Sequence, residues 1–332
     1  METDKIILQI TDKKTQEIEF IQLSDLADLN KALKDGLAKD IINMSEILMD
    51  KRINKIADEI KSRKDVKAVL ISGPSSSGKT TFSKRLSLHL MANGLKPYPI
   101  SLDDYFVDRT RTPLDEFGEY DYESIYALDL DLINKHVQQL LNKEEIELPR
   151  YDFPTGTSQM SGKKLRLEDD MILLVEGIHG LNPILTDAIP DDRKFKIYIS
   201  ALAPININKE QRISRTDSRL IRRILRDHKY RGTSAQSTIA RWPSVRRGED
   251  KWVFPFQQYA DAEFNSVQFY ELAILRNKVL PILAEVTMDQ PEFEVAQRLI
   301  KTLLMFEPID DFALIPPISL LREFMGGSSF RY

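Results

Sequence analysis

The sequence predicts an α/β protein in which helices cover a parallel β-sheet. Two observations lead to this class. From residue 66 onward, short apolar runs alternate with segments of helical periodicity, as in strands joined by crossover helices. The first run, 66–72, is followed directly by a loop rich in glycine and serine and then by a helical segment. We expect one α/β domain with a helical C-terminal part over residues 64–332, and a small attachment over residues 1–63.

The attachment is predicted to contain a β-hairpin followed by helices. Residues 5–22 hold two β-like runs around a polar Thr-Asp-Lys-Lys turn. Residues 24–63 have helical spacing with a break at Gly36. Its sequence offers no set of side chains suited to chemistry, so we expect the attachment to serve packing or contact with a partner.

The large domain is predicted to alternate strands with helices and to be mostly helical beyond residue 260. Buried parallel strands are typically continuous apolar runs, and four such runs occur. The expected strands are 66–72, 97–102, 171–175 and 195–200, and the expected helices are 79–93, 128–142 and 208–231.

The composition of the whole chain excludes several classes of protein. The 332 residues include no cysteine, which excludes a disulfide framework and thiolate metal sites. We find no secretory signal pattern and no apolar run near the roughly 18 residues of a membrane helix. The net charge of −4 predicts no general attraction to nucleic acid. A soluble, cytoplasmic protein without a membrane partner is expected. The sequence leaves open whether the protein forms a homo-oligomer.

The loop after the first strand fits the phosphate-binding pattern G-x-x-x-x-G-K-[ST]. Its glycines allow a tight backbone whose N–H groups point inward, and the following helix adds its positive end. The lysine would reach the outer phosphates, and the threonine hydroxyl would bind Mg²⁺. Because a serine-rich surface loop rarely lies between a buried strand and a helix, we predict a P-loop fold that binds ATP and Mg²⁺. The predicted nucleotide-binding residues are Gly73, Pro74, Ser75, Ser76, Ser77, Gly78, Lys79, Thr80 and Thr81.

Acidic residues follow two of the predicted strands. Asp103 and Asp104 come at the end of strand 97–102, the edge where open α/β sheets bind ligands. A carboxylate there could accept the proton of an attacking hydroxyl, and an acidic helix cap explains the pair equally well. Since neighbouring side chains on a strand face opposite ways, only one of the two is expected to face the phosphate loop. Glu176, at the end of the third strand, is predicted to share Mg²⁺ with Thr80.

Arginines recur at three- and four-residue spacing between residues 212 and 231. Arg219, Arg222 or Arg223, and Arg226 would share one helix face. Three explanations compete: a solvated face, an RNA-binding stripe, and a lid over the transferring phosphoryl group. We favour the lid, because guanidinium groups stabilise charge on phosphoryl oxygens in a protein that already has a triphosphate site.

Together these motifs resemble the uridine kinase and phosphoribulokinase family of P-loop kinases. More narrowly, the chain resembles bacterial uridine kinase-like proteins whose kinase domain follows a threonyl-tRNA synthetase-like region, with the first 60 residues similar to the junction. The likeness runs from residue 66 to the closing GGSSFRY. It rests on GPSSSGKTTF, Ser101–Tyr105, Tyr151–Phe153, Glu176–Ile178, and the stretch Asp217–Asp227 followed by Arg231-Gly232.

The resemblance implies a role for each matching residue. Asp103 would be the general base on a ribose 5′-hydroxyl, so Asp104 would be the carboxylate that turns to solvent or to a nearby cation. Asp121 would bind ribose hydroxyls, and Tyr151 would contact the nucleobase or sugar. The groups implied to act on the phosphates are Lys79, Arg223, Arg226 and Arg231, of which Arg223 would also contact the substrate.

The chain departs from the family pattern in several places. Gly156 stands where pyrimidine nucleoside kinases carry a base-reading histidine, which would open the base end of the pocket. Thr233 stands in place of an expected arginine, and residues 241–256 have no close counterpart in the small uridine kinases. Phosphoryl transfer is therefore better supported than uridine recognition. The arginines that could instead favour a more anionic acceptor are Arg241, Arg246 and Arg247, the first of them in place of an expected glutamine.

We therefore expect an ATP- and Mg²⁺-dependent kinase that phosphorylates a hydroxyl of a small acceptor, first of all a pyrimidine nucleoside. One rival is a kinase for another sugar or phosphosugar. The other is a nucleotide-gated RNA- or translation-associated module, to which the arginine row and the synthetase-like resemblance point. The presence of Asp103 and Glu176 beside Lys79 favours an enzyme, because a binding module needs no base.

Overall fold

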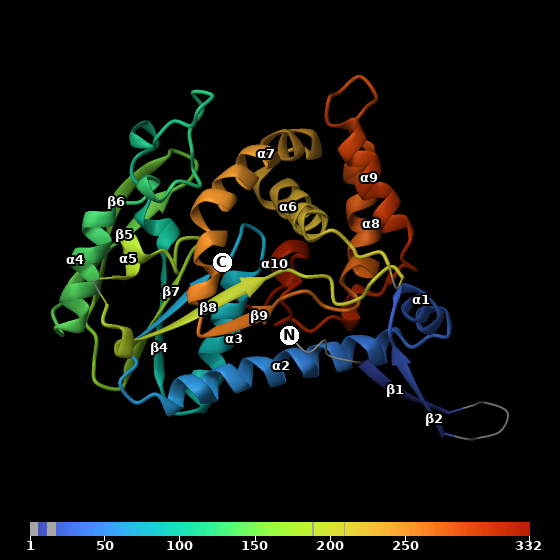
Figure 1. The fold of residues 1–332 in the computed structure, drawn as a ribbon, viewed down its shortest axis with the longest axis horizontal. Coiled ribbons are helices and arrows are strands. Elements are labelled where there is room, and N and C mark those ends of the chain that lie inside the picture. Colours follow the sequence, from blue (N-terminus) through green and yellow to red (C-terminus); the bar gives the residue numbers. More distant parts are fainter. Residues whose placement is uncertain (1–5, 12–17, 188, 209) are drawn as a thin grey trace. The chain divides into compact units, whose positions relative to one another are not determined.

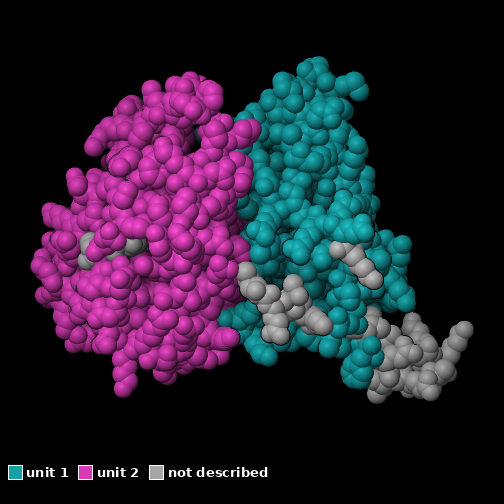
Figure 2. Space-filling view, in the orientation of Figure 1, with its two compact units in different colours: residues 1–52, 201–242, 265–332 teal, residues 53–200, 243–264 magenta. Residues whose placement is uncertain are grey.

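The structure is a computed structural model that describes residues 6–11, 18–187, 189–208 and 210–332. The chain forms two compact units (Figure 2). Helices α2 (Ala38–Ser62) and α7 (Ala235–Trp252) contribute residues to both. The expected division at residues 63 and 64 stays a prediction. Unit 1 comprises residues 1–52, 201–242 and 265–332, and unit 2 comprises residues 53–200 and 243–264.

Unit 2 is built on a five-stranded sheet with the strand order β4-β7-β3-β8-β9 (Figure 1). β3 pairs in parallel with β7 and β8, and β4 pairs in parallel with β7. All residues of β3 are buried, which explains its unbroken apolar sequence. The predicted α/β class is confirmed. The strands are β3 (Ala68–Ser72), β4 (Lys96–Ser101), β7 (Met171–Glu176), β8 (Lys194–Ser200) and β9 (Ala262–Asn265).

Helices and a second hairpin complete unit 2. α3 (Lys79–Ala92) follows β3 and packs against the sheet, where the rings of Phe82 and Phe264 lie 4.5 Å apart. The antiparallel hairpin of β5 (Ile146–Asp152) and β6 (Thr157–Leu165) is absent from the predicted elements. β6 is mostly polar and exposed, so it lacks the apolar alternation that indicates a strand. The other helices are α4 (Leu130–Leu141), α5 (Pro183–Thr186), and 3-10 turns at Leu102–Tyr105, Arg109–Arg111, Ile125–Ala127, Asp191–Arg193 and Phe254–Tyr259.

Unit 1 contains the predicted hairpin, in which β1 (Ile6–Thr11) pairs antiparallel with β2 (Ile18–Leu23). Most of its predicted turn lies outside the described residues. α1 (Leu26–Lys34) ends before Gly36, whose φ of +86° gives the predicted break before α2. The remaining helices are α6 (Arg215–Arg231), α8 (Glu271–Ala284), α9 (Phe293–Leu304), α10 (Arg322–Met325) and a 3-10 turn at Phe312–Leu314.

Helix α6 begins later than the predicted residue 208. The hydroxyl of Ser214 accepts the N–H of Asp217 at 3.3 Å and so caps the first turn. The whole of the arginine row from Arg215 to Arg231 is helical, as expected. Across the described ranges, the structure has no helix with the length and apolarity to span a bilayer.

Candidate active site

The phosphate loop joins β3 to α3 through backbone that only glycine permits at two positions. A Cβ atom on Gly73 would lie 2.3 Å from the carbonyl oxygen of Ile199, so no side chain fits there. Gly78 has a left-handed φ of +85° at the start of α3. Nζ of Lys79, in the first turn, donates to the carbonyl oxygen of Pro74 at 3.2 Å. The strand, loop and helix that the motif requires are therefore present.

The two side chains predicted to hold Mg²⁺ meet at the start of α3. Oγ1 of Thr80 donates to Oε1 of Glu176 at 3.1 Å, and Glu176 ends the strand next to β3. Hydroxyl and carboxylate oxygens suit Mg²⁺, which usually takes one or two protein carboxylates and completes its shell with water and phosphate oxygens. Thr80 and Glu176 therefore fit the metal that the motif implies.

A further carboxylate contacts the phosphate loop. The backbone N–H of Ser75 donates to Oε1 of Glu249 at 2.9 Å. Glu249 is fully buried in α7, and Nη1 of Arg246 lies 3.1 Å from its Oε2. Sequence reasoning missed this contact, because Glu249 follows Ser75 by 174 residues and no local pattern joins the two segments.

Asp103 and Asp104 lie on the 3-10 turn Leu102–Tyr105, because β4 ends at Ser101. The hydroxyl of Ser101 accepts the N–H of Asp103 at 3.3 Å and donates to Oε1 of Glu176 at 3.5 Å. One serine therefore links the predicted base to the predicted metal ligand. The expectation that the strand continues to residue 102 is wrong.

The two neighbouring carboxylates differ in environment. Asp103 is exposed, whereas Asp104 is half-buried and its Oδ1 accepts the N–H of Tyr151 at 3.5 Å. Burial raises the pKa of Asp104, the hydrogen bond from Tyr151 opposes that rise, and repulsion from Asp103 adds to it. Of the two directions expected for Asp104, the one towards solvent is therefore wrong, whereas the one towards a nearby cation agrees with the charges of Arg150 and Lys163, which oppose the rise in the pKa of Asp104.

An aromatic group surrounds Tyr151, whose side chain is buried. The ring of Phe106 lies 5.5 Å from the Tyr151 ring, and that of Phe153 lies 5.1 Å from it. These rings and Asp104 come together where the 3-10 turn Leu102–Tyr105 meets β5. Asp121 lies in the loop 113–124, where its Oδ1 accepts the N–H of Glu123 at 3.2 Å. Its predicted contact with ribose stays a prediction.

The space beside Gly156 is filled. A Cβ atom on Gly156 would lie 2.7 Å from Cζ of Arg109. Nη2 of Arg109 donates to the carbonyl oxygen of Phe153 at 2.5 Å. The backbone N–H of Arg109 donates to the carbonyl oxygen of Gly156 at 2.8 Å. The expected opening at this end of the pocket is therefore wrong, and no spacing in the sequence indicated Arg109.

In unit 1, the three predicted lid arginines converge on Asp227. Nitrogen atoms of Arg223, Arg226 and Arg231 lie 3.3, 2.9 and 3.4 Å from its carboxylate oxygens. The side chain of Asp227 is only 6% exposed, so it holds three cations at one buried point. Asp227 comes four residues after Arg223 and four residues before Arg231, and this helical spacing could have indicated it as their partner. The lid role of these arginines stays a prediction.

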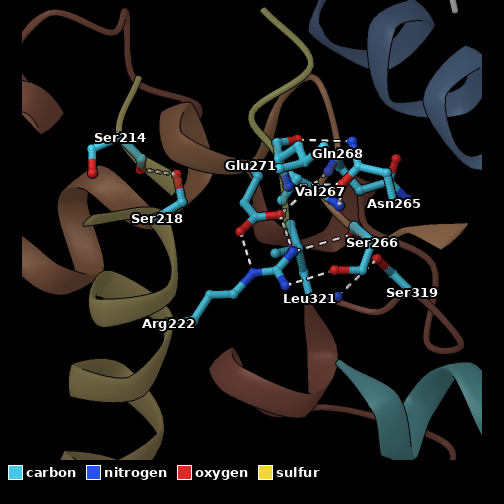
Figure 3. A network of polar contacts seen from close by, with 11 residues as sticks. Ser214, Ser218, Arg222, Asn265, Ser266, Val267, Gln268, Glu271, Ser319 and Leu321 are labelled. Carbon is cyan, nitrogen blue, oxygen red and sulfur yellow. Dashed lines mark hydrogen bonds and ion pairs between the residues drawn. The ribbon is translucent and has the colours of Figure 1, made fainter. Parts of the chain in front are cut away.

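Arg222 has a different role from Arg223 in the same helix. Its guanidinium is buried and forms an ion pair with Glu271 of α8, with Nη2 2.7 Å from Oε2 (Figure 3). The same group donates to Oγ and to the carbonyl oxygen of Ser266 at 2.9 and 3.1 Å. The choice between Arg222 and Arg223 that helical spacing left open is thus resolved, because Arg222 faces the core of unit 1.

We expect Arg222→Ala to lower the free energy of unfolding by about 3–5 kcal/mol, because it leaves the buried carboxylate of Glu271 without its cation. Urea denaturation followed by circular dichroism measures this change. Arg215→Ala, at an exposed position of the same helix, is the matched control and should change stability by less than about 0.5 kcal/mol. Equal losses for both variants would contradict a structural role specific to Arg222.

Residues 68–273 match the phosphoribulokinase / uridine kinase family. The chain belongs to this family. It is 30% identical to the uridine kinase of Anoxybacillus flavithermus over 60% of this chain and 85% of that protein. It is 33% identical to the uridine kinase of Bacillus pumilus over 58% of this chain and 82% of that protein. A solved structure titled as a possible uridine kinase from Bacillus stearothermophilus has a TM-score of 0.43 and 22% identity, covering 65% of this chain and 98% of that one.

Family membership confirms the resemblance to the uridine kinase and phosphoribulokinase family, whereas the narrower resemblance to kinases that follow a threonyl-tRNA synthetase-like region stays a prediction. The phosphoribulokinase / uridine kinase family consists of ATP-dependent phosphotransferases, so the chain is a nucleotide-binding P-loop kinase. The family contains kinases of more than one acceptor, and membership alone does not identify the acceptor of this chain.

Two of the three arginines in the segment 241–256, Arg246 and Arg247, form ion pairs with acidic residues. Arg246 pairs with Glu249 and Asp250 at 3.1 and 3.2 Å. Arg247 pairs with Asp115 at 3.4 Å, and its guanidinium lies 4.6 Å from the centre of the Phe117 ring. Since their charge is already balanced, these two arginines give less support to an anionic acceptor than the sequence indicated.

His179 is a buried packing residue. It is 2% exposed, and burial lowers its pKa to about 3, so the ring is neutral near pH 7.

Proposed function

We propose that this P-loop kinase transfers the γ-phosphoryl group of ATP, with Mg²⁺, to the 5′-hydroxyl of a pyrimidine nucleoside. One observation carries the proposal. Thr80, Glu176 and Ser101 form a continuous set of hydrogen bonds that ends at the backbone of Asp103. The backbone of the candidate base is therefore linked to the candidate metal ligands at the phosphate loop, which supports in-line transfer to a hydroxyl.

Each part of the reaction has a candidate residue. Lys79 and the loop amides would bind the outer phosphates, and Thr80 with Glu176 would hold Mg²⁺, which neutralises charge on the transferring group. Asp103 would accept the proton of the acceptor hydroxyl. The arginines of α6 would stabilise charge on the equatorial phosphoryl oxygens.

The surroundings of Tyr151 support a nucleoside over a phosphosugar. Phe153 is 51% exposed and packs against Phe106 and the buried Tyr151, so it offers an aromatic surface on which a planar base can pack. The two curated relatives named above are uridine kinases. In contrast, Arg246 and Arg247, the cations expected to bind an anionic acceptor, already have carboxylate partners.

Incubation with ATP, Mg²⁺ and a panel of uridine, cytidine, adenosine, ribose and a phosphopentose, analysed by mass spectrometry, tests the proposal. We expect a phosphorylated product from uridine or cytidine, and none from Asp103→Asn over the same time. A product from the phosphopentose alone would replace the nucleoside with an anionic acceptor. ATP binding without any phosphorylated product would support the nucleotide-gated module instead.

A further inference from the structure

Three consecutive residues of α7 contact two functional loops of unit 2. Arg247 lies 3.4 Å from Asp115. Gly248 packs so closely that a Cβ atom on it would lie 2.3 Å from Cβ of Glu123. Glu249 accepts the N–H of Ser75 at 2.9 Å. One side of this segment therefore contacts the loop 113–124, which carries the candidate ribose ligand, and the other contacts the phosphate loop.

The carboxylate of Glu249 occupies a donor that a phosphate would use. Amides of a P-loop bind phosphate oxygens because they point into the loop and carry positive partial charge. Here one of these amides, that of Ser75, is directed to a buried carboxylate. A triphosphate oxygen and the carboxylate of Glu249 are both acceptors that need the same N–H, so the two compete for it even though Arg246 balances the charge of Glu249.

We propose that Glu249 is an autoinhibitory latch, which competes with ATP for the phosphate loop until an acceptor bound at loop 113–124 draws α7 away. The inference rests on the proposed kinase function. The latch makes ATP and the acceptor bind cooperatively, because each ligand favours the arrangement in which Glu249 has left Ser75. Such an arrangement limits ATP hydrolysis by water when no acceptor is present.

Calorimetric titration with ATP and Mg²⁺, without acceptor, tests the competition. Glu249→Gln keeps the shape of the side chain and removes its charge, so we expect it to bind ATP about tenfold more tightly than the wild type. Asp250→Asn is the matched control, since Asp250 also pairs with Arg246 but is 63% exposed, and it should change affinity less than about twofold. Unchanged or weaker ATP binding by Glu249→Gln would overturn the latch.

A second variant, Gly248→Ala, changes the packing of α7 against the loop 113–124 and leaves Glu249 in place. Because the loop 113–124 and the phosphate loop contact opposite sides of this segment, the Cβ atom of Gly248→Ala would push α7 from Glu123 towards the phosphate loop, so this variant should bind ATP more weakly than the wild type while it retains Glu249. With saturating uridine and a non-hydrolysable ATP analogue in place of ATP, the nucleotide affinity of the wild type should rise about tenfold and that of Glu249→Gln should hardly change. An equal effect of uridine on both proteins would overturn the coupling to loop 113–124.

The titration also separates the latch from the kinase function. Lys79→Ala serves as the reference for a damaged phosphate loop. If the wild type and Lys79→Ala both fail to bind ATP, the proposed function fails and the latch with it. If the wild type binds ATP and Glu249→Gln binds it no more tightly, only the latch fails.

Discussion

Lys79→Ala is expected to reduce phosphoryl transfer by at least about a thousandfold while the protein stays folded. Within the described part of the chain, Nζ of Lys79 donates one hydrogen bond, to the carbonyl oxygen of Pro74 at 3.2 Å, and this contact contributes about 1 kcal/mol or less. In the reaction, the ammonium would instead neutralise charge on the outer phosphates, where it cannot be replaced by water without loss of rate. Turnover of ATP with uridine measures the effect, and thermal unfolding confirms the fold.

Lys96→Ala provides the control for Lys79→Ala. Lys96 begins β4, at the opposite end of the strand from the candidate site, and its exposed side chain pairs with Asp170. We expect this variant to keep normal turnover, because exposed ion pairs contribute little. A folded Lys79→Ala protein with wild-type turnover would remove the phosphate loop from the mechanism.

The phosphate loop could be predicted because its chemistry is local. Gly73, Gly78, Lys79 and Thr80 lie in one continuous segment, and each has a role set by backbone geometry or charge that the motif already specifies. The parallel sheet could be predicted for a similar reason, since buried strands such as β3 are apolar throughout. Both predictions use patterns formed by residues that lie close together in the sequence.

Contacts between distant segments could not be predicted in this way. Glu249 approaches Ser75, and Arg109 covers Gly156, only after the chain has folded. Helical spacing placed Arg222 and Arg223 near one face but could not show which of them meets Glu271. The partner of a buried charge is a tertiary property, and one sequence does not contain it.

The assignment of the base rests on two adjacent carboxylates with different environments. Asp103 is exposed and joined through Ser101 to Glu176, whereas Asp104 is half-buried and accepts the N–H of Tyr151. A base must reach the acceptor hydroxyl beside the transferring phosphate, and the link of the Asp103 backbone through Ser101 to Glu176 supports this role for Asp103. Asp104 instead contacts the backbone of Tyr151, the residue predicted to bind the acceptor.

We expect Asp103→Asn to lower kcat by roughly two to four orders of magnitude, because asparagine keeps the shape but cannot take the proton. Asp104→Asn should cost less than about tenfold, since its amide oxygen can still accept the N–H of Tyr151. The raised pKa of Asp104 means that the folded protein holds this proton more tightly than the unfolded chain, so ionised Asp104 reduces stability once the pH exceeds its folded-state pKa.

Asp104→Asn should therefore unfold at the same or a higher temperature than the wild type at pH 7, because the uncharged amide removes the cost of ionising a half-buried carboxylate. Steady-state assays of both asparagine variants with ATP and uridine, beside their melting curves, separate the two roles. If Asp104→Asn lost more activity than Asp103→Asn at unchanged melting temperature, the base would be Asp104, and proton transfer would take place on the side of the turn that faces Tyr151.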